Sequence, residues 1–141
     1  MKTMIKEAAI LFLITLVSGC LLGAVYSVTK TPIAEAKQRA KEAACKEVFA
    51  DADSFALKED LDLAAGNTYL SEQGYKVEIN EVSEAVSADG SVLGYVITLT
   101  DSEGYGGDIQ FSMGVRNDGT INAISFLSIS ETAGLGMKAD P

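Results

Sequence analysis

The hydrophobic pattern of the chain begins with an uncharged run, residues 8–28, which reads AAILFLITLVSGCLLGAVYSV. As an α-helix this run measures roughly 30 Å, the thickness of the hydrocarbon core of a bilayer. Eleven of its residues are Leu, Ile, Val or Phe, and each of these favours insertion. The pattern therefore predicts a single transmembrane helix over residues 8–28.

Two other interpretations of the same run stay open. Residues 17–20, Val-Ser-Gly-Cys, fit the motif that precedes a lipidated cysteine, and a basic start before an apolar stretch is also typical of a signal peptide that is removed. Leu21 and Leu22 continue the apolar run past Cys20, which favours a retained helix. All three interpretations place the rest of the chain outside the cytoplasm.

The flanks of the run indicate its orientation. Lys2 and Lys6 precede it with only Glu7 beside them, and short basic flanks tend to stay in the cytoplasm. Lys30 and the basic residues after it weaken this bias without reversing it. We therefore expect a single-pass protein of the cell membrane, with residues 1–7 cytoplasmic and the C-terminal domain extracytoplasmic.

A helical period follows the apolar run. Thr31 and Pro32 are typical of a helix start, with Thr as the N-cap and Pro at the first helical position. Beyond them, apolar residues recur every three or four positions, opposite several lysines: Ile33, Ala36, Ala40, Ala44 and Val48. We predict an amphipathic juxtamembrane helix in segment 29–50, which packs its Ala-rich stripe on the following domain; a solvated spacer is the alternative.

The remaining segment, 51–141, changes to a period of two. Residues 51–67 show no sustained period and predict a loop, whereas Tyr75, Val77 and Ile79 alternate with polar residues. Two Asp-Gly turns, at 88–91 and 117–119, each lie between apolar runs and predict two β-hairpins, 81–100 and 108–129. The fold class expected is α+β: helices followed by an antiparallel sheet with one packed face.

Charge and residue types exclude several kinds of chemistry. The net charge is −9, and residues 47–141 hold four Lys or Arg against 17 Asp or Glu, so binding to nucleic acid is disfavoured. The chain has no His, and its two cysteines, Cys20 and Cys45, form no metal-ligand spacing. We predict no catalytic residue and no metal site.

Two glycine-rich segments are the candidate binding elements. Residues 104–107 read Gly-Tyr-Gly-Gly, and residues 131–136 read Glu-Thr-Ala-Gly-Leu-Gly. Glycines let a flat ligand or another chain approach the backbone closely. Neither segment has the spacing of a dinucleotide-binding or P-loop fingerprint. The residues alone leave two interpretations open, a planar-ligand site and two ordinary glycine turns.

These motifs resemble, in order and over nearly the whole chain, the FMN-binding G subunit of Rnf ion-translocating electron-transfer complexes. The matching features are the basic start, the apolar helix, the T-P-I-A-E-A segment, G-Y-G-G, N-D-G-T-I and, most specifically, E-T-A-G-L-G. The C subunit of the sodium-pumping NADH:quinone reductase shares this domain. By position, the resemblance implies flavin contacts from Glu131, Thr132, Gly134, Leu135 and Gly136, with Tyr105 beside them.

The sequence departs from that family in two ways. Ala133 stands where the family has proline, which should loosen the loop. The S-G-A-T-x-[ST] motif that carries covalent FMN in the family does not occur in these residues, so Thr132 is not assigned as the attachment site. We therefore expect a C-terminally truncated chain with a partial FMN-binding domain.

The resemblance implies a function in electron relay. The chain would be a membrane-anchored subunit that passes electrons through FMN within an Rnf-type complex, together with the other membrane subunits. Such complexes transfer electrons between ferredoxin and NAD while moving an ion across the membrane. The alternative is a membrane- or lipid-anchored acidic interaction module without a cofactor.

Overall fold

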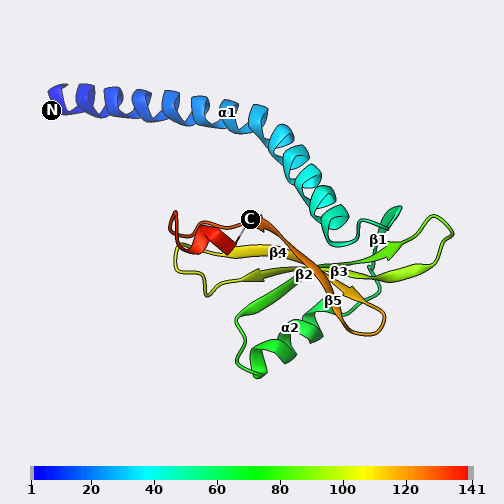
Figure 1. Ribbon diagram of the computed structural model, residues 1–141. Helices are drawn as coiled ribbons and strands as arrows, with labels where there is room; N and C mark the ends of the chain where they lie inside the picture. Colours follow the sequence, from blue (N-terminus) through cyan, green and yellow to red (C-terminus); the bar gives the residue numbers. More distant parts are fainter. Residues whose placement is uncertain (1, 140–141) are drawn as a thin grey trace. The chain divides into compact units, whose positions relative to one another are not determined.

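The computed structural model describes residues 2–139, in two compact units that divide after Arg39. The elements follow the order α1 (Lys2–Val48), β1 (Ser54–Leu57), α2 (Leu63–Glu72), β2 (Val77–Val86), β3 (Val92–Asp101), β4 (Ile109–Arg116), β5 (Ile121–Ser128) and the 3₁₀ helix η1 (Gly136–Ala139). Figure 1 shows the long helix followed by the sheet, so the predicted α+β class is confirmed. The predicted segments 1–7 and 51–141 each extend beyond the described residues.

The first unit consists of the part of α1 that ends at Arg39. From Met4 to Val48 this helix is long and apolar enough to cross a membrane, and the large apolar side chains of its first part are exposed. The hydroxyls in the apolar run donate to helix carbonyls: Thr15 to Leu11 and Ser27 to Gly23. These polar groups are therefore satisfied within the helix, as a hydrocarbon surrounding requires.

The predicted helix start at Thr31 and Pro32 is wrong, because α1 continues through both residues without a break. A proline inside a helix lacks the N–H that would bond the carbonyl four residues earlier, here that of Val28. Helix-forming residues on both sides, such as Ala34 and Glu35, maintain the helix despite this loss. The transmembrane and juxtamembrane helices expected from the sequence thus form one element.

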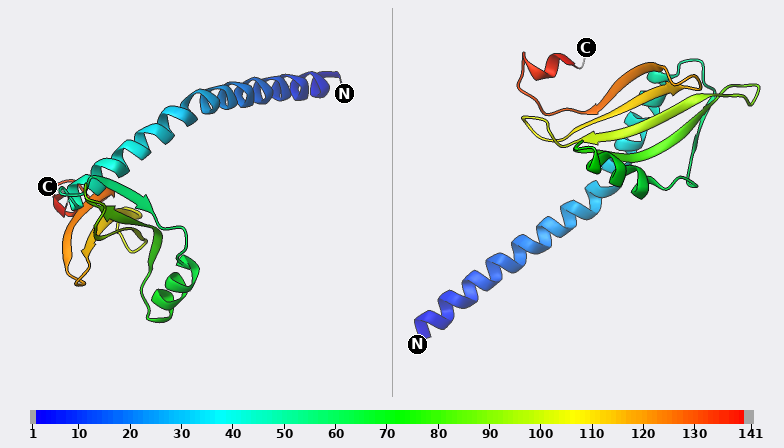
Figure 2. Two further views of the ribbon diagram at one scale, coloured as in Figure 1. Left: turned by 90° about the vertical axis from the view of Figure 1, so that its right-hand side faces the viewer. Right: turned by 90° about the horizontal axis from the view of Figure 1, so that it is seen from below.

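The second unit is built on a five-stranded antiparallel sheet in the order β1-β2-β3-β4-β5. Figure 2 shows the strands side by side from two directions. Both predicted hairpins are present, and their turns place Gly90 at φ 84° and Gly119 at φ 83°. A glycine reaches this left-handed region without steric cost, which is why Asp-Gly identified both turns.

The loop predicted for residues 51–67 is wrong in part. Strand β1 pairs with β2, from Ser54 opposite Val86 to Leu57 opposite Ser83, and α2 begins at Leu63. Asp62 caps this helix by accepting a hydrogen bond from the N–H of Ala65. Neither element produces a hydrophobic period in the sequence, because β1 has only four residues and α2 has no buried residues.

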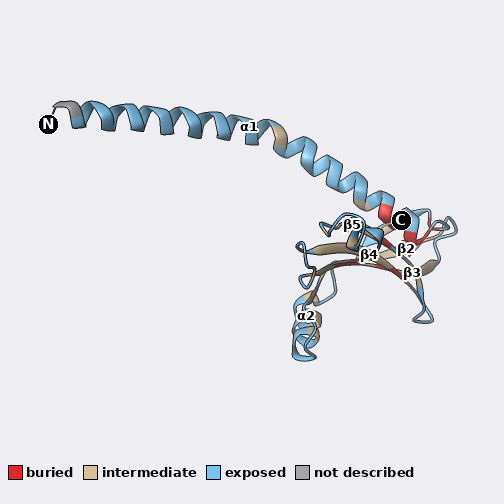
Figure 3. Ribbon diagram, turned by 60° about the vertical axis from the view of Figure 1, so that its left-hand side comes forward, coloured by how far each residue is buried: buried red, intermediate tan, exposed pale blue. Residues whose placement is uncertain are grey.

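The core lies where the last turns of α1 meet the sheet (Figure 3). Its buried residues are Cys45, Val48, Phe49, Ala52, Ala85 and Val96. Burial raises the pKa of the Cys45 thiol, because it penalises the thiolate. The Phe49 ring lies directly against Gly94 and Gly114, where added Cβ atoms would be 2.8 and 3.0 Å from ring carbons. The glycines thus provide the space that the ring fills.

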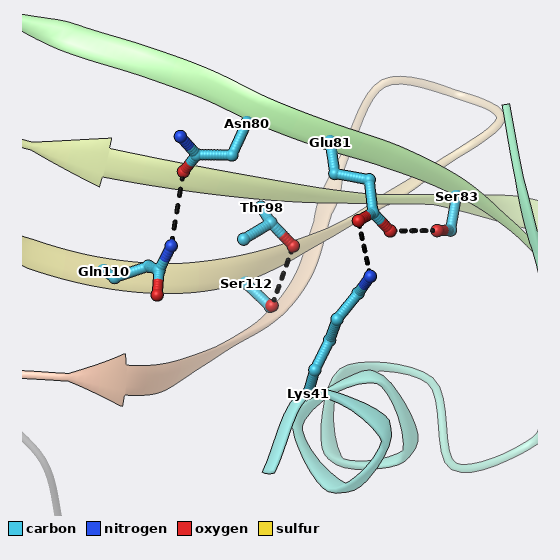
Figure 4. A network of polar contacts seen from close by, with 7 residues as sticks. All are labelled: Lys41, Asn80, Glu81, Ser83, Thr98, Gln110 and Ser112. Atoms are coloured by element: carbon cyan, nitrogen blue, oxygen red, sulfur yellow. Dashed lines mark hydrogen bonds and ion pairs between the residues drawn. The ribbon is translucent and has the colours of Figure 1, made fainter. Parts of the chain in front are cut away.

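Polar side chains of the sheet and of α1 form a network of contacts beside this core (Figure 4). Lys41 of α1 pairs with Glu81 of β2, which also accepts from the hydroxyl of Ser83. Thr98 and Ser112 share a buried hydrogen bond of 3.3 Å. Near the end of α1, Ser125 donates to Glu47 and Asn122 donates to the carbonyl of Val48. Packing and hydrogen bonds together hold this helix end on the sheet.

The opposite face of β4 and β5 is apolar, as the alternation predicted. Phe111 pairs with Phe126 and Met113 with Ile124 along the two strands, and the two phenyl rings lie 6.2 Å apart. These side chains remain half-buried or exposed, whereas Ser112 on the other face is completely buried. The deepest burial in β4 therefore belongs to its small and polar side chains.

Candidate functional site

The two glycine-rich segments lie at one end of the sheet. The first connects β3 to β4, where Asp101 pairs with Ile109, and the second follows β5, whose Ser128 pairs with Gln110. Because β3, β4 and β5 are neighbours in the sheet, both segments leave it at the same end of the strands. Figures 1 and 2 show the loop between β3 and β4 beside the C-terminal segment. The sheet thus brings together segments that are about 25 residues apart.

Direct contacts join the two segments. The N–H of Gly106 donates to Glu131 Oε1 at 3.2 Å. A Cβ atom placed on Gly106 would lie 2.0 Å from the carbonyl oxygen of Ser130, so a side chain cannot fit there without movement of the backbone. A Cβ atom on Gly104 would lie 2.9 Å from Glu131 Oε1. Gly106 is therefore needed for this close approach, whereas a Cβ atom on Gly104 would first meet the carbonyl oxygen of Gly107, 2.1 Å away in the same segment.

The second segment curls around Glu131. Gly134 adopts φ 79°, a left-handed conformation that suits glycine, and the N–H of Leu135 donates to the carbonyl of Thr132 at 3.1 Å. The chain then enters η1 at Gly136, where an added Cβ atom would lie 2.5 Å from Glu131 Cβ. The loop thus turns back against the Glu131 side chain, which stays half-buried.

The outer side of the two segments is open and partly apolar. Tyr105 is 94% exposed and Leu135 is 74% exposed. Within the described residues 2–139, and apart from each glycine and its two chain neighbours, no atom lies within 4 Å of a Cβ atom added to Gly107 or Gly134. Open glycine backbone beside exposed apolar side chains suits a flat, largely apolar ring system, which can approach the main chain closely.

The structure places the predicted site residues in two groups. Glu131 and Gly136 are half-buried between the segments, and Thr132, Gly134, Leu135 and Tyr105 are exposed. Gly104 and Gly106 were not predicted from the sequence as contacts of Glu131. Their clustering around Tyr105 was the available signal, but nothing in the spacing identifies a partner 25 residues later.

A second concave region lies away from these segments. A groove of about 330 Å³ separates the end of β1 from the start of α2, and Leu57, Leu61 and Val82 are among its lining residues. Lys58, also in this lining, bonds Glu84 at 2.8 Å, and that hydrogen bond raises the pKa of Lys58. Across residues 2–139, no group of three His, Cys, Asp or Glu side chains is arranged to hold a metal ion.

Comparison with known proteins finds the same resemblance. Residues 1–48 match the family described as the RnfG N-terminal region, and residues 104–140 match the FMN-binding domain. Over 140 residues the chain is 33% identical to the G subunit of the Na⁺-translocating ferredoxin:NAD⁺ oxidoreductase complex of Acetobacterium woodii. The resemblance to RnfG found in the sequence is confirmed. Both glycine segments lie within the FMN-binding-domain match.

The alignment with that relative covers 98% of this chain and 66% of the relative. The chain therefore spans just under two thirds of the length of the curated relative that it matches.

Proposed function

We propose that this chain is the membrane-anchored flavoprotein subunit of an Rnf-type electron-transfer complex, and that FMN binds at the two glycine segments. One observation carries the proposal: the FMN-binding-domain match begins at Gly104 and includes both segments, which the hydrogen bond between Gly106 and Glu131 joins. The flavin surface then consists of Tyr105 from one segment and Thr132, Gly134 and Leu135 from the other.

The bound flavin would supply the redox chemistry, accepting and donating single electrons. The residues of the chain would bind and orient it. Tyr105 and Leu135 offer exposed apolar surface, and the open backbone at Gly107 and Gly134 permits a close approach of the ring. This role requires no acid, base or nucleophile from the chain, which agrees with a sequence that contains no His.

The anchor and the partners follow the same proposal. Residues 8–28 cross the cell membrane with the N-terminus in the cytoplasm, and the sheet domain lies outside the cytoplasm. The apolar, exposed side chains of α1 support an anchoring role. The partners are the other membrane subunits of an Rnf-type complex, since the relative from Acetobacterium woodii is itself one subunit of a larger complex.

The test is flavin content in the protein purified from its native membrane. We expect flavin absorbance in the folded protein, and in-gel fluorescence with a matching increase in intact mass if the flavin is covalently bound. A chain with no flavin before and after denaturation contradicts the proposal, and favours an acidic interaction module at the membrane. Gly134→Val, which places a branched side chain at a left-handed backbone position, should reduce the flavin content.

A further inference from the structure

Glu131 occupies an unusual position among the residues of the flavin segment. Its side chain is half-buried, whereas Tyr105 and Leu135 are exposed. Instead, Oε1 accepts the N–H of Gly106 from the other segment and lies 2.9 Å from the Cβ position of Gly104. Its own Cβ lies 2.5 Å from the Cβ position of Gly136. Three glycines therefore surround one acidic side chain.

We propose that Glu131 is a positioning residue, which holds the two glycine segments together as one surface and does not itself contact the flavin. The inference rests on the proposed function, because it assigns a role within the same site. A carboxylate that accepts a backbone N–H forms a charge-assisted hydrogen bond, stronger than one between neutral groups. This bond directly joins the segment that follows β3 to the segment that follows β5. The covalent chain connects these two segments only through β4 and β5.

The surrounding glycines support this assignment. A side chain at Gly104 would meet the carboxylate, and one at Gly136 would meet the Cβ and Cγ atoms of Glu131. At Gly106 it would meet the carbonyl of Ser130, the residue directly before Glu131. Gly106 and Gly136 therefore preserve the place of Glu131 or of the backbone that carries it, whereas a side chain at Gly104 would first meet the Gly107 carbonyl of its own segment. Gly107 and Gly134, which have no such neighbours, leave the outer side free for a ligand.

Loss of the carboxylate should separate the segments without unfolding the domain. The core residues Val48, Phe49, Ala85 and Val96 form a separate cluster that does not include Glu131. Without the bond, Gly106 exchanges its amide proton faster, and Tyr105 and Leu135 no longer belong to one fixed surface. Flavin affinity falls as a consequence, because ordering the segments then opposes binding.

The experiment compares Glu131→Ala, Glu131→Gln and the control Glu103→Ala in the full chain in detergent micelles. Glutamine retains an acceptor oxygen at the same reach. Glu103 is the acid directly before the first segment, and it pairs with Lys76 at 3.1 Å. Hydrogen exchange at Gly106 is measured in flavin-free protein, and flavin content is measured separately after loading with FMN.

We expect exchange at Gly106 to be about tenfold faster in Glu131→Ala and unchanged within about twofold in Glu103→Ala. In Glu131→Gln the exchange rate should lie between these two, because a neutral acceptor oxygen forms a weaker hydrogen bond than a carboxylate. Unchanged exchange in Glu131→Ala overturns the positioning role, whatever the flavin content. A second result would also overturn the positioning role: Glu131→Gln retains the protection of Gly106 from exchange but loses flavin as completely as Glu131→Ala. In that case Glu131 contacts the flavin directly. If no variant and no wild-type chain binds FMN while exchange responds as expected, the positioning role stands and the proposed function fails.

Discussion

Asn67 of α2 satisfies both backbone groups of Ile79 in β2: its Nδ2 donates to the carbonyl at 3.1 Å and its Oδ1 accepts from the N–H at 2.7 Å. Strand β1 ends its pairing at Ser83 of β2, and the register of β2 against β3 shifts between Ile79 and Glu81. The amide side chain thus replaces a neighbouring strand where the edge of β2 is otherwise unpaired, and it fixes α2 to the sheet.

Replacing Asn67 with Ala should lower the free energy of unfolding by about 1–3 kcal/mol, because two partly buried backbone groups of Ile79 lose their partner. Urea unfolding in detergent micelles measures the change. The control is Thr68→Ala, since the Thr68 hydroxyl donates only to the Ala64 carbonyl within α2. This change should lower the free energy of unfolding by less than about 0.5 kcal/mol. Equal effects of the two variants would refute the bridging role of Asn67.

Two glycine-to-alanine changes should have opposite effects on stability. A Cβ atom on Gly114 would lie 3.0 Å from both the Phe49 ring and the Val48 carbonyl, so Gly114→Ala overpacks the core and should destabilise by about 1–3 kcal/mol. Gly66 lies inside α2, with only an ordinary contact of 3.5 Å to Ile79. Gly66→Ala should therefore stabilise by up to about 1 kcal/mol.

Thermal unfolding of both variants tests this contrast. The expected result is a lower midpoint for Gly114→Ala and a higher midpoint for Gly66→Ala. A Gly114→Ala protein as stable as the wild type would show that the space between Phe49 and the sheet is less restricted than the contacts of Gly114 indicate.

Titration of Asp89, in the turn between β2 and β3, should depend on Ser87. The Ser87 hydroxyl, followed by the N–H and hydroxyl of Ser91, lowers the pKa of Asp89 from 3.8 to about 2. A folded-state pKa below the unfolded value means that the stabilisation is present above pH 3.8 and is lost as the pH falls toward 2. Ser87→Ala should raise the pKa of Asp89 toward its ordinary value.

A carboxyl-detected NMR titration measures this shift. Asp118 provides an internal control, because its pKa is lowered by the hydroxyl and N–H of Thr120 in the other hairpin turn and should not respond to Ser87→Ala. Parallel changes at both residues would point to a global effect instead of a local hydrogen bond.

The membrane anchor is tested by Leu16→Arg. A charge in the middle of the apolar run should cost about 2.5–3.5 kcal/mol of insertion free energy. Carbonate extraction should then release more of the variant from membranes than of the wild type. Ile33→Arg, beyond the run, should leave the extraction unchanged. If Leu16→Arg resists extraction as fully as Ile33→Arg does, residues 8–28 are not the anchor.

The hairpins could be predicted from the sequence because their information is local. An Asp-Gly pair between alternating runs determines a tight turn, and Gly90 and Gly119 both adopt positive φ angles. The apolar run of α1 was equally clear. The continuation of α1 through Pro32 could not be predicted, because the local pattern also fits a helix start and the continuation depends on residues on both sides of the proline.

The side of the sheet that is most deeply buried could not be predicted from hydrophobicity. In β4, Phe111 and Met113 alternate with Ser112 and Gly114, and the usual rule assigns the apolar set to the interior. The end of α1 covers the other set, because Phe49 needs the space that Gly114 leaves. In the candidate site, the six predicted residues lie in the two glycine segments. The hydrogen bond from Gly106 to Glu131 could not be predicted, because it depends on the order of the strands, which no local motif encodes.

Because Cys45 is buried, its reactivity reports when the junction between α1 and the sheet opens. The thiolate is the form that attacks alkylating reagents, and the Cys45 side chain is both 4% exposed and shifted toward the thiol form by burial. In a Cys20→Ser background, and with maleimide in such excess that labelling outpaces closing, the labelling rate should therefore equal the rate at which the junction between α1 and the sheet comes apart. Kinetic measurements of that junction then need no introduced cysteine, in detergent or in the native membrane.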